Sequence, residues 1–591
     1  MVWGKQVSEK SDRFKGRVNI LLIGIICGFL FLLCRVAYLQ LWKGERYFYL
    51  SQNSRLQLIP LPPFRGLILD RKGKILAENK VSFSVGVIPS NVKDMNHLLG
   101  CLAKVLHVNK EIAIKRLQKA FNPFRPVCLK EDISMSELTL LLEREEKFPG
   151  TVIITNPMRF YPHRKLASHL MGHLGEINSE ELLMNSLEDI EQGDFIGKMG
   201  VEKVYNKYLQ GKKGGRQIEI DAYGHPLRTI SERDPLSGDN IYLTIDLKMQ
   251  EIAEEELGNR CGSVIIGDPW TGEIFTLASH PAFDPNLFSR SISKEEWDKL
   301  RYNPEHSLQN RAIGGEYSPA STFKIIVAAA ALENKVVRKE ETLWCKGSLR
   351  IGNRVFKDWK VHGKVNLEKA VVQSCDVFFY QLGLKTGRKE IIRFARLFGL
   401  GEPTGIDLLS ESRGLLPTSS WKLKNKGEKW WRGDTANLSI GQGYILVTPV
   451  QMFRVISAIA NGGKIVKPYL VKKIVDTKGR VIKGSCEQEI RKMPLSSSTL
   501  RFLRESLKKV VKEGTGWKAE NKVVEISGKT GTVELPEGEN PHSWFIGYAP
   551  SENPSLAIVV LIEHIKEEER SASEITGRIL SRIFKKQKRQ D

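Results

Sequence analysis

A serine and a lysine stand three residues apart at a loop-to-helix boundary in the segment EYSPASTFKIIVAAAALE, residues 316–333. Turn-prone and small residues open this segment, and an almost wholly apolar, helix-forming run follows from Phe323. Ser321 and Lys324 should therefore project from one face of a helix start. A lysine amine beside a serine hydroxyl can act as the general base for a nucleophile. The alternative is a serine helix cap and a lysine whose ammonium reaches solvent, and this spacing alone does not decide between them.

Two more polar motifs follow in chain order. AVVQSCDVFFYQLG places Ser374 and Asp376 two residues apart, just before an aromatic helix. EISGKTGTVEL is predicted to be a strand, and it carries the polar run Lys529, Thr530, Gly531 and Thr532. A second Lys-Thr-Gly run occupies residues 385–387, but it follows a helical stretch, so we interpret it as a chance match in a helix-ending turn.

The ordered triplet S-x-x-K, S-x-[ND] and K-T-G resembles that of serine acyl transferases acting on D-alanyl-D-alanine peptides and β-lactams. This resemblance implies that Ser321 attacks the carbonyl carbon, and that Lys324 relays the proton with Ser374 as intermediary. It also implies a substrate-binding set, in which backbone N–H groups of Ser321 and Thr532 form the oxyanion hole. That set comprises Asp376, Lys529, Thr530, Gly531 and Thr532.

Further segments extend the resemblance almost from end to end, to the class B penicillin-binding proteins. RGLILDRKGKILA is similar to a family box just outside the membrane, and GKMGVEKVYNKYLQG to a second box, with Gly197, Gly200 and Glu202 in place. HSWFIGYAP and LSIGQGYILVTPVQM are similar to transpeptidase segments. The chain departs from the family in YSPAST, where Ser318 and Ala320 replace a more usual proline and glycine.

The resemblance predicts a multi-domain α+β protein with a transpeptidase domain of the serine β-lactamase-like fold, a central antiparallel sheet plus a helical subdomain. GSVIIGDPWTGEIFTLAS predicts two strands of that sheet joined by a turn at 268–272, and strands return only near the C-terminus. A length of 591 residues with 41% hydrophobic residues provides ample core for several domains. We expect a cytoplasmic tail (1–17), a transmembrane anchor (18–42), an elongated α+β pedestal (43–237), a transpeptidase domain (238–580) and a basic tail (581–591).

The segment VNILLIGIICGFLFLLCRVAYLQLW, residues 18–42, is long and apolar enough to cross a membrane. Five basic residues precede it, which favours a cytoplasmic N-terminus and places everything after residue 45 outside the cytoplasm. A cleavable signal peptide is the alternative, but the apolar run is longer than a typical signal core. We therefore predict a single-pass protein of the bacterial cytoplasmic (inner) membrane.

Net charge is +22, which suits nucleic acid, an anionic membrane or an acidic polymer. The sequence lacks zinc-finger spacing, a Walker loop and RNA-binding strands, so we expect no nucleic-acid partner. Some elongation-type relatives carry a zinc site between the first two motifs, where Cys345, Asp358 and His362 lie here. No fourth ligand is evident, so we predict a buried cysteine and a surface histidine, with no metal and no cofactor.

Together these features predict a serine-type peptidoglycan D,D-transpeptidase that serves cell-wall elongation, binds β-lactam antibiotics and could retain D,D-carboxypeptidase activity. Expected partners are the D-Ala-D-Ala donor stem peptide, an acceptor amine, and a SEDS-family glycosyltransferase of the elongation machinery. Alternatives are a septal transpeptidase, a membrane-bound β-lactamase or carboxypeptidase, and a non-catalytic β-lactam sensor or scaffold. The pedestal and family boxes favour the transpeptidase, since hydrolases have little use for them.

Overall fold

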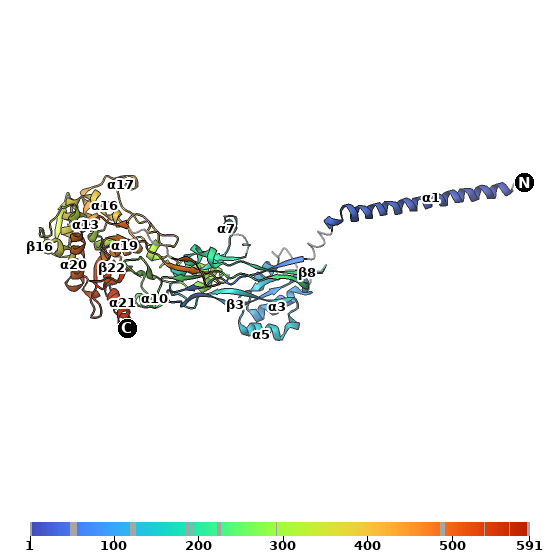
Figure 1. Ribbon diagram of the computed structural model, residues 1–591, viewed down its shortest axis with the longest axis horizontal. Helices are drawn as coiled ribbons and strands as arrows, with labels where there is room; N and C mark the ends of the chain where they lie inside the picture. Colours follow the sequence, from blue (N-terminus) through green and yellow to red (C-terminus); the bar gives the residue numbers. More distant parts are fainter. Residues whose placement is uncertain are drawn as a thin grey trace.

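The computed structural model describes residues 3–47, 56–118, 126–184, 190–191, 193–221, 226–290, 292–484, 491–536, 538–566 and 568–587. The molecule is elongated, with helix α1 (Trp3–Ala37) at one end, a strand-rich pedestal in the middle and a mixed domain at the other end (Figure 1). The sequence predicted this order of an anchor, a pedestal and a catalytic domain.

The predicted anchor is helical. Helix α1 continues into a short π-helical turn, η1 (Tyr38–Trp42), and the apolar stretch Gly16–Trp42 is 27 residues long with no buried residue. At 1.5 Å per residue it extends about 40 Å, enough to cross the ~30 Å hydrocarbon core of a bilayer.

A seven-stranded sheet forms the spine of the pedestal, in the order β19-β18-β10-β2-β3-β4 with β5 also paired to β3. Strands from opposite sides of residue 238 meet in it, because β10 pairs with β2 on one side and with β18 on the other. The strands are β2 (Ile68–Leu69), β3 (Ile75–Val87), β4 (Val127–Lys130), β5 (Thr151–Phe160), β10 (Asn240–Leu243), β18 (Val471–Val475) and β19 (Val481–Gly484).

Smaller elements complete the pedestal, including a three-stranded sheet in the order β1-β8-β9 and the pair β6-β7. These strands are β1 (Leu56–Leu61), β6 (Leu174–Glu176), β7 (Phe195–Gly197), β8 (Gly214–Ile220) and β9 (Pro226–Arg233). The helices are α3 (Met95–Leu106), α4 (Lys110–Gln118), α5 (Met135–Glu143), α6 (Ser168–Met171), α7 (Ser179–Met184), α8 (Gly200–Val204) and α9 (Asn206–Leu209).

A buried ion cluster joins the two family boxes of the pedestal. The fully buried carboxylate of Glu202 accepts hydrogen bonds from Arg65 Nε at 2.6 Å and Arg159 Nε at 2.7 Å. Removing one partner would leave uncompensated buried charge, so the three side chains depend on one another for their stability.

The catalytic domain is built on a five-stranded antiparallel sheet in the order β12-β11-β23-β22-β21. As predicted, the first hairpin and the last three strands come from opposite ends of the domain sequence. These strands are β11 (Gly262–Gly267), β12 (Ile274–His280), β21 (Ser527–Val533), β22 (His542–Ala549) and β23 (Leu556–Ile562).

Between those two strand groups lie helices and small hairpins, so the region 321–515 is less purely helical than the sequence suggested. The strands form the pairs β13-β16, β14-β15 and β17-β20, with β13 (Thr342–Cys345), β14 (Ser348–Ile351), β15 (Arg354–Lys357), β16 (Gly363–Asn366), β17 (Lys464–Ile465) and β20 (Arg491–Lys492). The helices are α11 (Lys294–Arg301), α12 (Arg311–Gly314), α13 (Lys324–Glu333), α14 (Leu367–Val372), α15 (Asp376–Thr386), α16 (Arg388–Leu397), α17 (Ser419–Lys426), α18 (Arg432–Ser439), α19 (Pro449–Ala460) and α20 (Ser497–Glu513).

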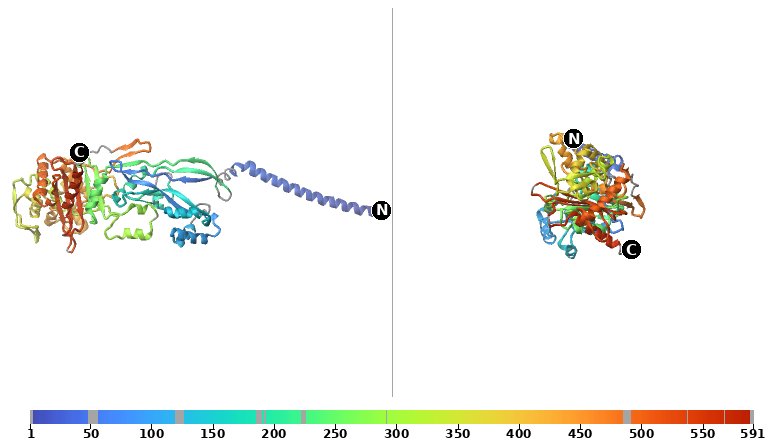
Figure 2. Two further views of the ribbon diagram at one scale, coloured as in Figure 1. Left: turned by 90° about the horizontal axis from the view of Figure 1, so that it is seen from below. Right: turned by 90° about the vertical axis from the view of Figure 1, so that its left-hand side faces the viewer.

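Two terminal helices, α10 (Leu247–Leu257) and α21 (Ala572–Gln587), pack against each other beside the sheet (Figures 1 and 2). Asp246 caps α10 by accepting from the backbone N–H groups of Lys248 and Met249. Helix α21 extends into the region predicted to be a basic tail, as far as Gln587, and residues 588–591 lie outside the described residues. Ile583 is buried there and Arg582 donates to Glu256, because the helix has an apolar face that the sheet and α10 cover.

Candidate active site

Ser321 lies in a tight turn that leads directly into helix α13. The turn is a 3-10 segment, η5 (Ala320–Phe323), and Ser321 stays partly exposed while the three residues after it are buried. Two hydrogen bonds hold the turn from outside: Ala320 N–H donates to Gly441 O at 2.9 Å, and Trp544 Nε1 donates to Ser318 O at 3.1 Å. The hydroxyl is therefore presented at the surface of a fixed loop.

Ala320 adopts a backbone conformation that favours glycine. Its φ is +47°, in the left-handed region that costs an ordinary L-residue about 1 kcal/mol. The family that the sequence resembles more usually has glycine at this position. Its replacement by alanine therefore places strain directly before the predicted nucleophile.

Lys324 is fully buried and points at the second motif. Its Nζ donates to Ser374 O at 2.8 Å, to Ser374 Oγ at 3.2 Å and to Asp376 Oδ1 at 2.7 Å. The ring of Phe379 lies 5.4 Å from the same ammonium. The lysine in the apolar helix thus has a complete set of polar partners and does not reach solvent.

The second motif is held in a sharp turn between α14 and α15. Ser374 has φ +56°, and Cys375 is the N-cap of α15, accepting from Phe378 N–H. This turn directs Ser374 Oγ and the Asp376 carboxylate to the same side, where both meet Lys324.

Lys529 approaches Ser374 from the opposite side. Its Nζ donates to Ser374 Oγ at 3.0 Å, and the whole side chain is buried. Burial lowers the pKa of Lys529 well below its ordinary value, the nearby Lys324 lowers it further, and Asp376 opposes both. Ser374 Oγ therefore accepts hydrogen bonds from two buried lysines.

The K-T-G motif lies on β21, the last strand of the five-stranded sheet, beside η5. Thr530 Oγ1 is 2.7 Å from Thr515 Oγ1, and Thr532 is exposed. A Cβ on Gly531 would lie 3.1 Å from Thr322 Cγ2 and 3.2 Å from Pro319 O, so glycine permits the close packing of strand and nucleophile loop. The outer edge of β21 can accept an extended peptide as an added strand.

The structure thus brings the three predicted motifs together. Lys324, Ser374, Asp376 and Lys529 form one hydrogen-bonded group, while Ser321 and the Thr530–Thr532 run border it on η5 and β21. The sequence did not single out Thr515, the partner of Thr530, because no motif marks a residue that joins the site through a tertiary contact.

The second Lys-Thr-Gly run lies elsewhere and ends helix α15, as predicted. Gly387 caps the helix with φ +81°, and exposed Lys385 pairs with Glu341 at 2.7 Å. It has no part in the three-motif group.

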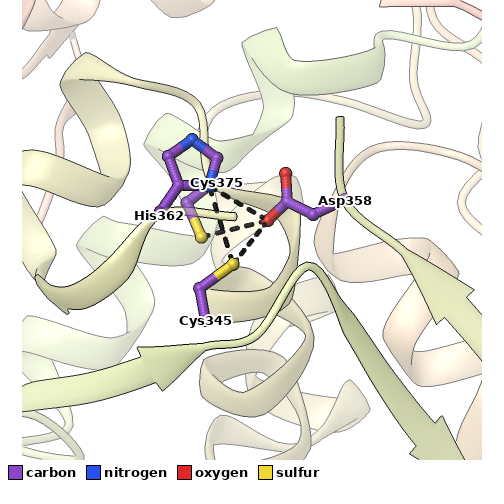
Figure 3. Close-up of side chains that lie close together, drawn as sticks. All are labelled: Cys345, Asp358, His362 and Cys375. Carbon is purple, nitrogen blue, oxygen red and sulfur yellow. Dashed lines mark hydrogen bonds and ion pairs between the residues drawn. The ribbon is translucent and has the colours of Figure 1, made fainter. Parts of the chain in front are cut away.

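Four side chains of metal-binding types converge beside the second motif (Figure 3). The ligand-type atoms of Cys345, Asp358, His362 and Cys375 all lie within 4.8 Å of one another. Asp358 Oδ2 is 3.3 Å from Cys345 Sγ, 3.1 Å from Cys375 Sγ and 3.5 Å from His362 Nδ1.

This cluster corrects one prediction from the sequence. The imidazole of His362 is fully buried, so the expected surface histidine is wrong. Cys375 supplies the fourth potential ligand that was not identified from the sequence. It was already visible as the middle residue of the motif Ser-Cys-Asp, but only the fold shows that it faces Cys345.

Two family models match the chain. The penicillin-binding protein transpeptidase domain matches residues 262–585, and the penicillin-binding protein dimerisation domain matches residues 60–243. These ranges cover the catalytic sheet and most of the pedestal.

Similar proteins cover nearly the whole chain. The peptidoglycan D,D-transpeptidase MrdA of Acinetobacter baumannii is 33% identical over 95% of this chain and 86% of the relative. A solved complex between penicillin-binding protein PBP2 and MreC from Helicobacter pylori has a TM-score of 0.78 at 29% identity, covering 90% of this chain and 99% of that chain. A peptidoglycan synthase complex described for its coordination of polymerization and crosslinking has a TM-score of 0.72 at 29% identity, covering 96% and 98% of the two chains.

These matches favour the elongation-type transpeptidase over the septal, hydrolytic and non-catalytic alternatives. The two family models follow the order of pedestal and catalytic domain, and the relative covers nearly the whole chain. The chain belongs to the class B penicillin-binding proteins, as a peptidoglycan D,D-transpeptidase of the elongation type.

Proposed function

We propose that Ser321 carries the acyl group during cross-linking. The carbonyl carbon of a D-Ala-D-Ala donor stem is attacked by Ser321 Oγ, the terminal D-alanine leaves, and an acceptor amine from a neighbouring stem resolves the ester. The observation that supports this is the convergence of two buried lysines on Ser374 Oγ, next to the turn that presents Ser321.

Each member of the group has a separate task in this proposal. Lys324 takes the proton of Ser321, Asp376 orients the Lys324 amine, and Ser374 passes the proton toward the departing D-alanine amine. Lys529 and Thr530 bind the terminal carboxylate of the donor.

The donor backbone lies along β21, which Gly531 keeps close to the nucleophile loop. The N–H groups of Ser321 and Thr532 stabilise the negative oxygen that develops on the attacked carbonyl. Hydrolytic release of the acyl group in place of transfer remains a prediction.

We further propose that Cys345, Asp358, His362 and Cys375 hold a zinc ion. Two thiols, an imidazole and a carboxylate form a donor set that suits tetrahedral zinc, and four protein ligands are typical of a structural site. The ion would neutralise the clustered donors and hold Cys375 in place. Its neighbours Ser374 and Asp376 would then be held in the orientation that meets Lys324.

The anchor and the pedestal suggest where the enzyme works. We propose that the N-terminus is cytoplasmic, and that the pedestal and catalytic domain lie outside the cytoplasmic membrane. Relatives solved with MreC and within a peptidoglycan synthase complex support a role in the elongation machinery. A SEDS-family glycosyltransferase would contact the anchor and pedestal, because those parts lie at membrane height.

The test is mass spectrometry of the full-length protein after exposure to a β-lactam. We expect one added acyl mass, located on the peptide that contains Ser321, and none in Ser321→Ala. The variant loses one hydroxyl at a partly exposed turn, so its thermal unfolding should match that of the wild type. Acylation on another serine, or undiminished acylation of the variant, would contradict the assignment.

A further inference from the structure

A basic groove runs along helix α16, outside the group that contains Ser321. Two connected cavities of about 620 Å³ and 850 Å³ share Arg388 and Lys389 in their walls. Helices α16 and α17 lie together at the end of the molecule that is remote from α1 (Figure 1). The membrane that holds the anchor is therefore at the opposite end from this groove.

Cations dominate the walls of this groove. Seven cationic and two acidic side chains line it, and one of the two, Glu390, already pairs with Arg393 at 2.8 Å. The cations are Arg388, Lys389, Arg393, Arg396, Arg413, Lys429 and Arg491.

Three of these cations already have partners in the protein: Arg393, which pairs with Glu390, and also Arg388 and Arg491. Arg388 donates to Ser419 Oγ and lies 4.9 Å from the ring of Trp430, and Arg491 donates to Leu397 O at 2.9 Å. Among the residues that the structure describes, Lys389, Arg396, Arg413 and Lys429 have no carboxylate at ion-pair distance. Clustered like charges repel, so the groove is a site where an anion would relieve that repulsion.

The groove begins one helix length from the catalytic group. Asp376, which contacts Lys324, is the first residue of α15, and Thr386 at the end of that helix lines the groove. Eleven residues of α-helix extend about 16 Å. An extended peptide of five residues spans about 17 Å, so a stem peptide can reach from one place to the other.

We propose that this groove binds the carboxylate ends of uncross-linked stem peptides and aligns a peptidoglycan strand beside Ser321. This inference rests on the proposed function, which supplies a polymer whose free stems end in D-alanine carboxylates. Arginine recognises carboxylates through paired N–H donors, and four of the seven cations are arginines on α16 and β20.

The test measures binding of soluble, uncross-linked peptidoglycan strands to the full-length protein in detergent, after Ser321 has been acylated with a β-lactam. Acylation blocks the nucleophile, so the remaining binding reports other sites. We expect Arg396→Glu/Arg413→Glu to raise the dissociation constant about tenfold or more, because both exposed arginines become repulsive. Added salt should weaken wild-type binding, and strands with amidated stem carboxylates should bind about as weakly as the variant binds native strands.

The matched control is Arg350→Glu/Arg354→Glu, which reverses two exposed arginines of the same domain that do not line the groove. It should bind strands as the wild type does. Equal loss in both variants, or full binding of amidated strands, would overturn the proposal. Tighter binding of polyphosphate than of strands would overturn the ligand class. A wild-type chain that is not acylated at all contradicts the proposed function instead, so the two failures are distinguishable.

Discussion

At the scale of single residues, the proposed catalytic group is a set of short contacts around one hydroxyl. Ser374 Oγ receives hydrogen bonds from both Lys324 and Lys529, and Asp376 Oδ1 accepts a further one from Lys324. Motif spacing predicted these residues because each motif sits at the start of a helix or on a strand edge. It could not predict that Asp376 would contact a lysine, since that contact needs α13 and α15 to pack together.

The two Lys-Thr-Gly runs provide a matched pair of variants. Lys529→Ala should slow acylation by a fluorescent penicillin at least 100-fold, because the carboxylate of the penicillin would lose a charged hydrogen-bond donor in a buried site. Lys385→Ala should leave the rate within about twofold, since exposed surface pairs contribute little. Equal effects of the two substitutions would show that β21 does not carry the substrate.

The buried lysine also predicts a pH dependence. The pKa of Lys529 is lowered by burial and by Lys324, so its charge should be lost below the pH at which an exposed lysine titrates. Acylation should therefore decline as pH rises through this lowered pKa. Asp376 raises the pKa of Lys529, so Asp376→Asn should move that decline to lower pH. Rates of penicillin acylation measured across the pH range check this. A decline that occurs at the same pH or at a higher pH in Asp376→Asn than in the wild type would contradict it.

At the scale of elements, the hairpins between the first two motifs assemble the metal-type cluster. Cys345 ends β13, Asp358 follows β15, His362 precedes β16, and Cys375 caps α15. The sequence showed the first three residues but could not join them to the fourth, because Cys375 reaches Cys345 only through the packing of α15 against β13. Individual strands of the catalytic sheet were predictable because turns and buried apolar runs are local features, whereas their antiparallel arrangement was predicted from the family resemblance.

Zinc analysis of the purified protein tests this cluster. We expect stoichiometric zinc in the wild type, and its loss together with a fall of a few degrees in Tm after Cys345→Ser, because one of four ligands is removed. Cys261→Ser, at a cysteine outside the cluster, should keep the zinc. A zinc-free wild type, or a Cys345→Ser protein with full zinc, would show that the four donors have another purpose.

At the scale of the whole molecule, the basic residues before the anchor predict which side of the membrane the catalytic domain occupies. An alkaline phosphatase reporter fused after residue 60 should be active, and the same reporter fused after residue 17 should be inactive, because basic residues precede the span. The reverse result would overturn both the orientation and access to the cell wall.

The elongation assignment predicts a change in cell shape. Depleting the protein in a rod-shaped host should give rounded cells, since side-wall synthesis would lose its cross-linking step. Complementation with the wild type, and not with Ser321→Ala, ties the phenotype to acylation. Filaments with blocked septa would instead place the enzyme in division.

The sheet that combines β2, β10 and β18 has a mechanical meaning. Its strands come from both sides of residue 238, so backbone hydrogen bonds run without a break from the pedestal into the chain of the catalytic domain. A single flexible linker would let the catalytic domain rotate relative to the pedestal, whereas a shared sheet resists bending and torsion. The pedestal and the catalytic domain would then move as one body, so the distance from Ser321 to the far end of the pedestal would stay constant while new cross-links form.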